Sequence, residues 1–160
     1  MVGDARISLR QELNENRLGQ RFDVLVLDAF NGDSLPLHLL TREAFALYLA
    51  HLDEQGILAI HASSRYFALE PVIVRQIEDL DLAGARIVNG RVGDYDDPSE
   101  WILVSRSRPL IERISRLAPT NAFSGQHRYL TAWTDDHSNS LQVVKAGSAL
   151  PLLKWFARSP

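Results

Sequence analysis

The chain has no cysteine among its 160 residues. This absence excludes a disulfide framework, a zinc site built on thiolates and a cysteine nucleophile. An excess of basic charge is also lacking, because 17 Lys and Arg stand against 20 Asp and Glu, for a net charge of −3. Nucleic-acid binding depends on a surplus of basic side chains that neutralise phosphates. No nucleic-acid partner is therefore expected.

Long hydrophobic runs are absent as well. The most apolar stretch lies between Asp23 and Asp28, whereas a membrane-spanning helix needs about 20 apolar residues. Residues 1–13 lack the apolar core of a secretory signal. The sequence predicts a soluble, cytoplasmic protein. The five histidines show no metal-ligand spacing, so no metal is expected, and His51 is expected on a solvated helix face.

The sequence does contain an alternation of strand and helix patterns. Strands are predicted over residues 22–30, 56–62, 85–92 and 100–105. Helices are predicted from a cap at Thr41 to near Gly56, over residues 69–80 and over residues 109–117. The first strand is expected to be buried on both faces. A short turn-rich segment joins the last two strands, so they are expected to form an antiparallel hairpin at one edge of a mostly parallel α/β sheet.

Polar residues follow the first two strands, at the place where open α/β sheets bind ligands. Asp28, Asn31 and Asp33 follow the first strand, and His61, Ser63, Ser64 and Arg65 follow the second. A carboxylate at the end of an apolar strand, as at Asp28, can hold or deprotonate an amine. It can also cap a turn. Position alone leaves both interpretations of Asp28 open, and Asp4 after Gly3 can likewise be a simple helix cap.

Residues 32–35, Gly-Asp-Ser-Leu, match the nucleophile block of GDSL-type esterases, in which Ser34 would attack an ester. Such enzymes usually place an Asp three residues before a His near the C-terminus. Here Thr134 holds that position before His137. The esterase stays an alternative hypothesis, as does a non-catalytic interaction module that keeps the fold.

Four segments together resemble the spermidine synthase-like family: GDAR at 3–6, DVLVLDAFNGDSLPLHLLTREAFALYL at 23–49, GILAIHASSRYFALEPVIV at 56–74 and WTDDHSN at 133–139. The resemblance implies the class I methyltransferase fold, with a seven-stranded Rossmann-like sheet. It also implies S-adenosylmethionine or its decarboxylated form as a substrate. The implied reaction is aminopropyl transfer to a small polyamine or amine.

The resemblance further implies roles for individual residues. Asp4 resembles the acid that hydrogen-bonds the adenine amino group, with the Ala5 backbone beside it. Asp28 is similar to the catalytic carboxylate that positions and deprotonates the attacking amine. Substrate contacts are expected at Asn31, Asp33, Ser64, Tyr66 and Asp135. Family members typically read D-S-S-D-P from the catalytic acid, whereas residues 28–33 here read D-A-F-N-G-D, so the second acid is displaced or replaced.

In this fold the glycine-rich strand and the ribose-binding acid would precede Gly3. Residues 1–160 are therefore expected to form a single partial domain, weak or inactive in transfer by itself. The strand that ends in Asp28 would then have an unpaired outer edge, with Val24 and Val26 on an uncovered apolar surface. Unpaired edges recruit other chains, so a homodimer or larger homo-oligomer is expected through this edge.

Overall fold

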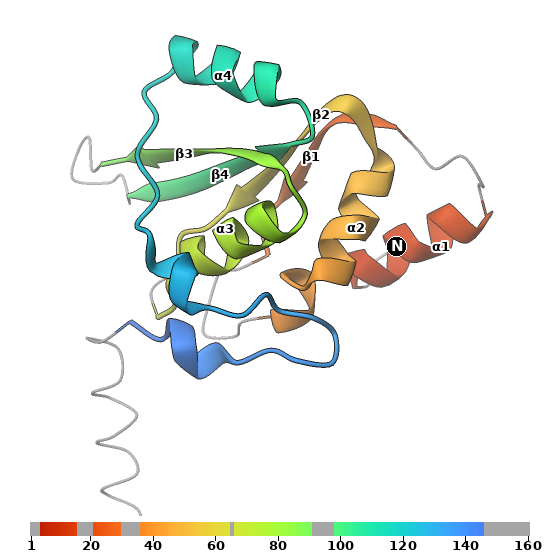
Figure 1. The fold of residues 1–160 in the computed structure, drawn as a ribbon. Coiled ribbons are helices and arrows are strands. Elements are labelled where there is room, and N and C mark those ends of the chain that lie inside the picture. The colour runs from red at the N-terminus through yellow and green to blue at the C-terminus, as the bar shows by residue number, and fades with distance from the viewer. Residues whose placement is uncertain (1–3, 16–20, 30–35, 65, 91–97, 146–160) are drawn as a thin grey trace, which may run out of the picture.

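The computed structural model describes residues 4–15, 21–29, 36–64, 66–90 and 98–145. Helices lie on both faces of a four-stranded sheet (Figure 1). The strands are β1 (Phe22–Leu27), β2 (Leu52–His61), β3 (Ala83–Asn89) and β4 (Ser99–Ser105). The α-helices are α1 (Ala5–Glu15), α2 (Arg42–His51), α3 (Glu70–Asp79) and α4 (Arg108–Leu117), and the short 3-10 helices are η1 (Leu37–Leu39), η2 (Gln126–Tyr129) and η3 (Ser140–Val143).

The strand order is β1-β2-β4-β3. β1 pairs with β2 in parallel, and β4 runs antiparallel to both β2 and β3. Three of the four described strands therefore share one direction, and β4 alone is reversed between two of them. This arrangement confirms the predicted α/β class, with β3 and β4 forming the antiparallel pair at one end, and it is consistent with a partial Rossmann-like sheet.

The first predicted helix begins as expected and ends earlier than expected. Thr41 Oγ1 accepts a hydrogen bond from the Ala44 N–H at 3.3 Å and so caps α2. The helix ends at His51, and β2 begins at the next residue. Gly56 lies inside β2, where an added Cβ would come within 2.9 Å of the Phe22 carbonyl oxygen. This glycine therefore allows β1 and β2 to approach closely and does not end the helix.

The larger hydrophobic core lies between one face of the sheet and the helices α2 and α3. On α3, the buried side chains include Val72 and Ile73, as the helical spacing predicts. Gln76 is fully buried on the same helix. Its Nε2 donates to the Leu40 and Trp133 carbonyl oxygens at 3.0 and 2.8 Å. These two bonds tie α3 to the start of α2 and to the C-terminal segment.

The opposite face of the sheet is covered unevenly. At the β3–β4 end, α4 lies over the sheet (Figure 1), and its Ile111 packs on Ala83 and Ala85. At the other end, Val24 and Val26 of β1 are 54% and 57% exposed. The prediction that the first strand is buried on both faces is therefore wrong, because no described helix covers this part of the sheet. The expected exposure of the two valines is confirmed, and among the described strands β1 pairs with β2 alone.

His51 corrects a second expectation. It was expected on a solvated face, and it is fully buried. Its Nδ1 lies 2.9 Å from the Leu47 carbonyl oxygen, and its ring stacks on Phe22 with centroids 6.4 Å apart. The physical reason is the early helix end, because the chain turns directly into β2 and carries the ring toward the start of β1.

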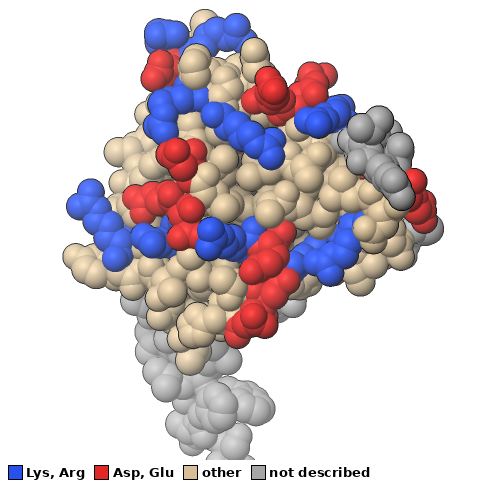
Figure 2. Space-filling model, turned by 45° about the vertical axis from the view of Figure 1, so that its right-hand side comes forward, with Lys and Arg blue, Asp and Glu red and all other residues tan. Residues whose placement is uncertain are grey.

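Acidic and basic side chains are interspersed on the face shown in Figure 2. This mixture agrees with a net charge of only −3. Within the described ranges, no helix combines the length and the apolar character needed to cross a membrane.

Candidate active site

The carboxyl ends of β1 and β2 bring a carboxylate and an imidazole together. The parallel register pairs Leu27 with Ile60, so the residues that follow, Asp28 and His61, are neighbours. Asp28 Oδ1 lies 2.8 Å from His61 Nδ1. An ionised carboxylate only accepts hydrogen bonds, so in this pair Nδ1 carries the proton. The two side chains are 45% and 17% exposed, which places the pair at the surface of this edge.

Two neighbours hold the imidazole in place. His61 stacks on Trp101, its register partner on β4, with ring centroids 4.7 Å apart and an interplanar angle of 18°. A backbone hydrogen bond to β4 holds the chain after His61, since the Ala62 N–H donates to the Glu100 carbonyl oxygen at 2.7 Å. The Glu100 N–H in turn donates to Ser63 Oγ at 2.7 Å. The ring orientation is thus set from β1, β2 and β4 together.

Asp4 has a different environment. Its Oδ1 accepts hydrogen bonds from the Arg6 and Ile7 N–H groups at 2.9 and 3.1 Å, so it caps α1. Its Oδ2 lies 2.7 Å from His38 Nε2. Burial raises the pKa of Asp4, but the hydrogen bonds from Ile7 and His38 outweigh burial and lower the pKa overall. The capping interpretation describes this geometry, and a nucleoside contact of Asp4 or of the exposed Ala5 stays a prediction.

Asp135 is bound by a nearly buried arginine. The Arg6 guanidinium contacts both carboxylate oxygens, with Nη1 2.7 Å from Oδ1. Thr41 Oγ1 donates to the same oxygen at 2.8 Å. The hydrogen bond from Arg6 lowers the pKa of Asp135, and the same bond raises the pKa of Arg6. This cluster joins α1 and the start of α2 to the segment that follows Trp133.

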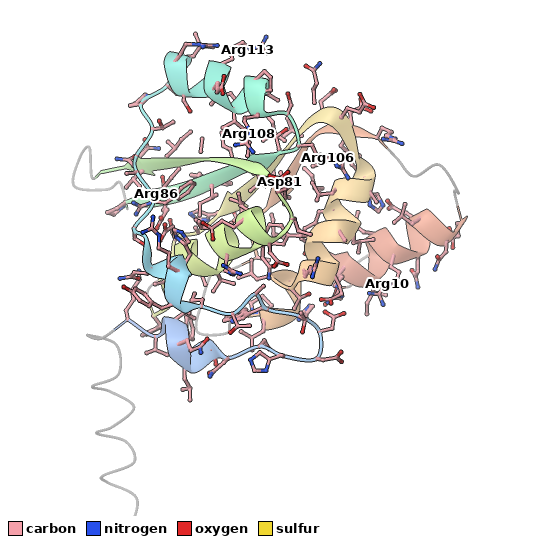
Figure 3. All side chains as sticks on the ribbon, viewed as in Figure 1. Arg10, Asp81, Arg86, Arg106, Arg108 and Arg113 are labelled. Carbon is pink, nitrogen blue, oxygen red and sulfur yellow. The ribbon has the colours of Figure 1, made fainter. Side chains whose placement is uncertain are left out.

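Asp4 and Asp135 line the same hollow, although they lie near opposite ends of the chain. The hollow has a volume of about 340 Å³ and is also lined by Arg6, Arg10 and His38. Arg10 extends from α1 (Figure 3). The structure therefore brings two of the predicted site residues together, while Asp28 is not among the residues that line this hollow.

Ser64 and Tyr66 follow β2 and contact the end of the described chain. The carbonyl oxygen of Ser64 accepts a hydrogen bond from Lys145 Nζ at 2.7 Å. The Tyr66 carbonyl oxygen accepts one from the Lys145 N–H at 2.9 Å. Ser64 Oγ accepts one from the Phe67 N–H at 3.3 Å. Two of these contacts join the segment after β2 to Lys145, and a role of either residue in binding substrate stays a prediction.

Three further predicted residues, Asn31, Asp33 and Ser34, lie outside the described residues, so the substrate contacts and the esterase hypothesis stay predictions. Within the part of the chain that is described, no cluster of three or more His, Asp or Glu side chains could hold a metal ion.

His61 is the residue that sequence reasoning placed near the site without assigning it a role. Its place directly after the second strand indicates that it lies beside Asp28, because adjacent parallel strands bring their last residues together. The partners of Asp4 and Asp135 gave no such signal. His38 and Arg6 reach them from segments whose mutual packing no local pattern encodes.

The comparisons with known proteins support the family resemblance. No family model matches the chain. A polyamine aminopropyltransferase of Vibrio vulnificus (strain CMCP6) is 28% identical over 131 residues. The match covers 82% of this chain and 38% of that protein, so it spans less than half the length of the relative. This similarity supports the resemblance to the spermidine synthase-like family, at a distance.

Proposed function

We propose that this chain provides the amine-activating part of an aminopropyltransferase site. The reaction is transfer of an aminopropyl group from decarboxylated S-adenosylmethionine to an amine of a polyamine. The observation that carries the proposal is the position of Asp28, a carboxylate at the carboxyl end of β1, hydrogen-bonded to His61, in a chain related to a polyamine aminopropyltransferase.

The chemistry requires a carboxylate or another base at this point. An amine acceptor is an ammonium ion at neutral pH, and an ammonium has no lone pair with which to attack carbon. It must first lose a proton. The lone pair then forms the C–N bond at the carbon beside the sulfonium, the C–S bond breaks, and a neutral thioether leaves. Asp28 supplies the negative charge that attracts the ammonium, and the proton passes to the carboxylate or to the imidazole that Asp28 orients.

The hollow beside α1 is proposed as the binding place of the nucleoside. Asp4 would accept a hydrogen bond from the adenine amino group, next to the Ala5 backbone. In the free chain Asp4 contacts His38, and these side chains are 32% and 48% exposed. Exposed ion pairs contribute little stability, about 0–1 kcal/mol, so this contact can be exchanged for a ligand. Asp135 shapes the same hollow through its ion pair with Arg6.

The test uses decarboxylated S-adenosylmethionine and a diamine such as putrescine, with the aminopropylated product measured by mass spectrometry. We expect slow transfer by the wild-type chain, as for a partial domain, and a further loss of at least about 100-fold for Asp28→Asn. Asp23→Asn is the matched control, because Asp23 is an exposed carboxylate on the same strand. Product formation that is equal in both variants contradicts the assignment of Asp28. Methyl transfer from ordinary S-adenosylmethionine without aminopropyl transfer contradicts the proposed reaction.

One observation favours a second candidate, the interaction module. β1 has no neighbour on its outer side among the described strands, and Val24 and Val26 are more than half exposed beside that edge. Open apolar edges favour strand addition, so we infer self-association through β1. Calorimetry separates the two candidates: heat of binding with decarboxylated S-adenosylmethionine favours the enzyme, and its absence together with self-association favours the module.

A further inference from the structure

The Asp28–His61 pair leaves one imidazole nitrogen available. Asp28 contacts Nδ1, and Nε2 makes no hydrogen bond with any described residue. Nε2 is also not among the buried side-chain atoms that lack a partner, although His51 Nε2 is. Solvent therefore reaches His61 Nε2. With the proton held on Nδ1 by the carboxylate, Nε2 presents a lone pair at the edge of the sheet.

A second histidine in the same chain has the opposite arrangement. Asp4 contacts His38 through Nε2, so the carboxylate occupies the outer nitrogen of that ring. His38 is thus an internal comparison for His61. The two rings differ in which nitrogen the carboxylate orients, and only in His61 does the pairing leave Nε2 as the acceptor.

We propose that His61 Nε2 is the atom that removes the proton from the attacking amine, a role that rests on the aminopropyltransferase function proposed above. The ammonium N–H gives its proton to Nε2, and the freed lone pair forms the C–N bond while the C–S bond breaks. The imidazolium that results is stabilised by Asp28 on Nδ1 and by the face of Trp101. It later returns the proton to water.

Basicity favours this assignment over direct transfer to the carboxylate. Imidazole side chains are stronger bases than carboxylates by about 2–3 pKa units. General-base catalysis is most efficient when the base is matched to neutral pH. Asp28 in this arrangement holds the ring and its tautomer, and it provides the negative charge beside the developing cation. The carboxylate and the imidazole therefore act as one unit.

The first test needs no activity. Nitrogen-15 NMR of the whole chain at neutral pH reports the tautomer of each histidine, with His61→Asn and His38→Asn variants to assign the signals. We expect His61 to carry its proton on Nδ1, and the neutral form of His38 to carry it on Nε2. A His61 ring protonated on Nε2 has no lone pair there and overturns the proposal.

The second test separates a base from a residue that only positions Asp28. The amide of His61→Asn can still donate to Asp28 from the place of Nδ1, and it has no group at the place of Nε2. We expect kcat to fall by at least about 100-fold, with the KM for the amine changed only a few-fold. His137→Asn, at an exposed histidine, is the matched control. The melting temperature of each variant is measured to confirm that it is folded.

Double substitution completes the test. Because the two groups act as a unit, we expect Asp28→Asn combined with His61→Asn to be no more than a few-fold slower than the slower single variant. If His61→Asn transfers the aminopropyl group at the wild-type rate while Asp28→Asn is inactive, the role of His61 is overturned. The proposed function would then stay in place. A wild-type chain that transfers no aminopropyl group refutes the proposed function itself.

Discussion

Replacing Asp135 with alanine distinguishes a structural role for this residue from the substrate contact that the family resemblance implies. In the substituted chain, Arg6 keeps its hydrogen bond to the His38 carbonyl oxygen, at 2.8 Å, and the longer 3.4 Å contact with Thr41 Oγ1. It loses both of its bonds to the carboxylate. The Arg6 side chain is only 9% exposed. Its charge would therefore remain in a largely buried position without a counterion.

The expected cost follows from this geometry. Breaking a fully buried ion pair costs about 3–5 kcal/mol, but the Asp135 side chain is 41% exposed. Solvent screens part of the interaction, and we expect a loss of about 2 kcal/mol in the free energy of unfolding. For a chain of this length, such a loss lowers the melting temperature by about 4–8 °C. Asp136→Ala, at the exposed next residue, is the control and should change stability by no more than about 0.5 kcal/mol.

The pH dependence gives a second readout of the same pair. Arg6 lowers the pKa of Asp135 in the folded chain. The stabilisation is therefore complete above the pKa of the unfolded chain, near 4, and is lost as the pH falls through the lower pKa of the folded chain. Wild type and Asp135→Ala should converge in stability between about pH 5 and about pH 2. Equal melting temperatures of Asp135→Ala and Asp136→Ala at neutral pH would refute the reasoning.

Three further outcomes are expected. Gly56→Ala should lower the free energy of unfolding by about 1–3 kcal/mol in chemical denaturation, because the new Cβ would lie 2.9 Å from a backbone oxygen of β1. Gly90→Ala is the control, because no atom lies within 4 Å of the position of its Cβ. An equal loss of unfolding free energy in the two variants contradicts the prediction. Gln76→Leu should lower the free energy of unfolding by about 2–4 kcal/mol, because it leaves two carbonyl oxygens without their donor. A variant as stable as wild type in the same denaturation assay contradicts this prediction. Sedimentation at micromolar concentration should report a dimer or larger species that Val24→Lys with Val26→Lys dissociates, whereas a wild-type monomer rules out assembly through β1.

The regular elements were predictable wherever the local pattern alone determines them. The apolar face of α3 and the capping hydroxyl of Thr41 appear where the sequence places them. The sequence predicts the start of β2 too late, at residue 56. The reason is that Asp53 to Gln55 are polar and exposed and resemble the end of a helix. The burial of His51 depends on where α2 ends. Because the helix was predicted to continue to near Gly56, His51 was also predicted, wrongly, to lie on a solvated face.

The candidate site was predictable in part for a related reason. Asp28 could be located because it ends an apolar strand, and its pairing with His61 follows from parallel register. The binding of Asp135 by Arg6 could not be foreseen, since it depends on how α1 packs against α2 and on the path of the chain after Trp133. Such contacts are products of tertiary packing and carry no local sequence signal.

The most direct test of the central claim measures turnover and stability together in Asp28→Asn. Asp28 is 45% exposed at the end of β1, so its substitution should leave the melting temperature within about 2 °C of wild type. Aminopropyl transfer to the diamine should fall by at least about 100-fold in the same preparation. A variant that keeps its turnover while its melting temperature falls by several degrees would contradict the account, because Asp28 would then be a turn cap and not the catalytic carboxylate.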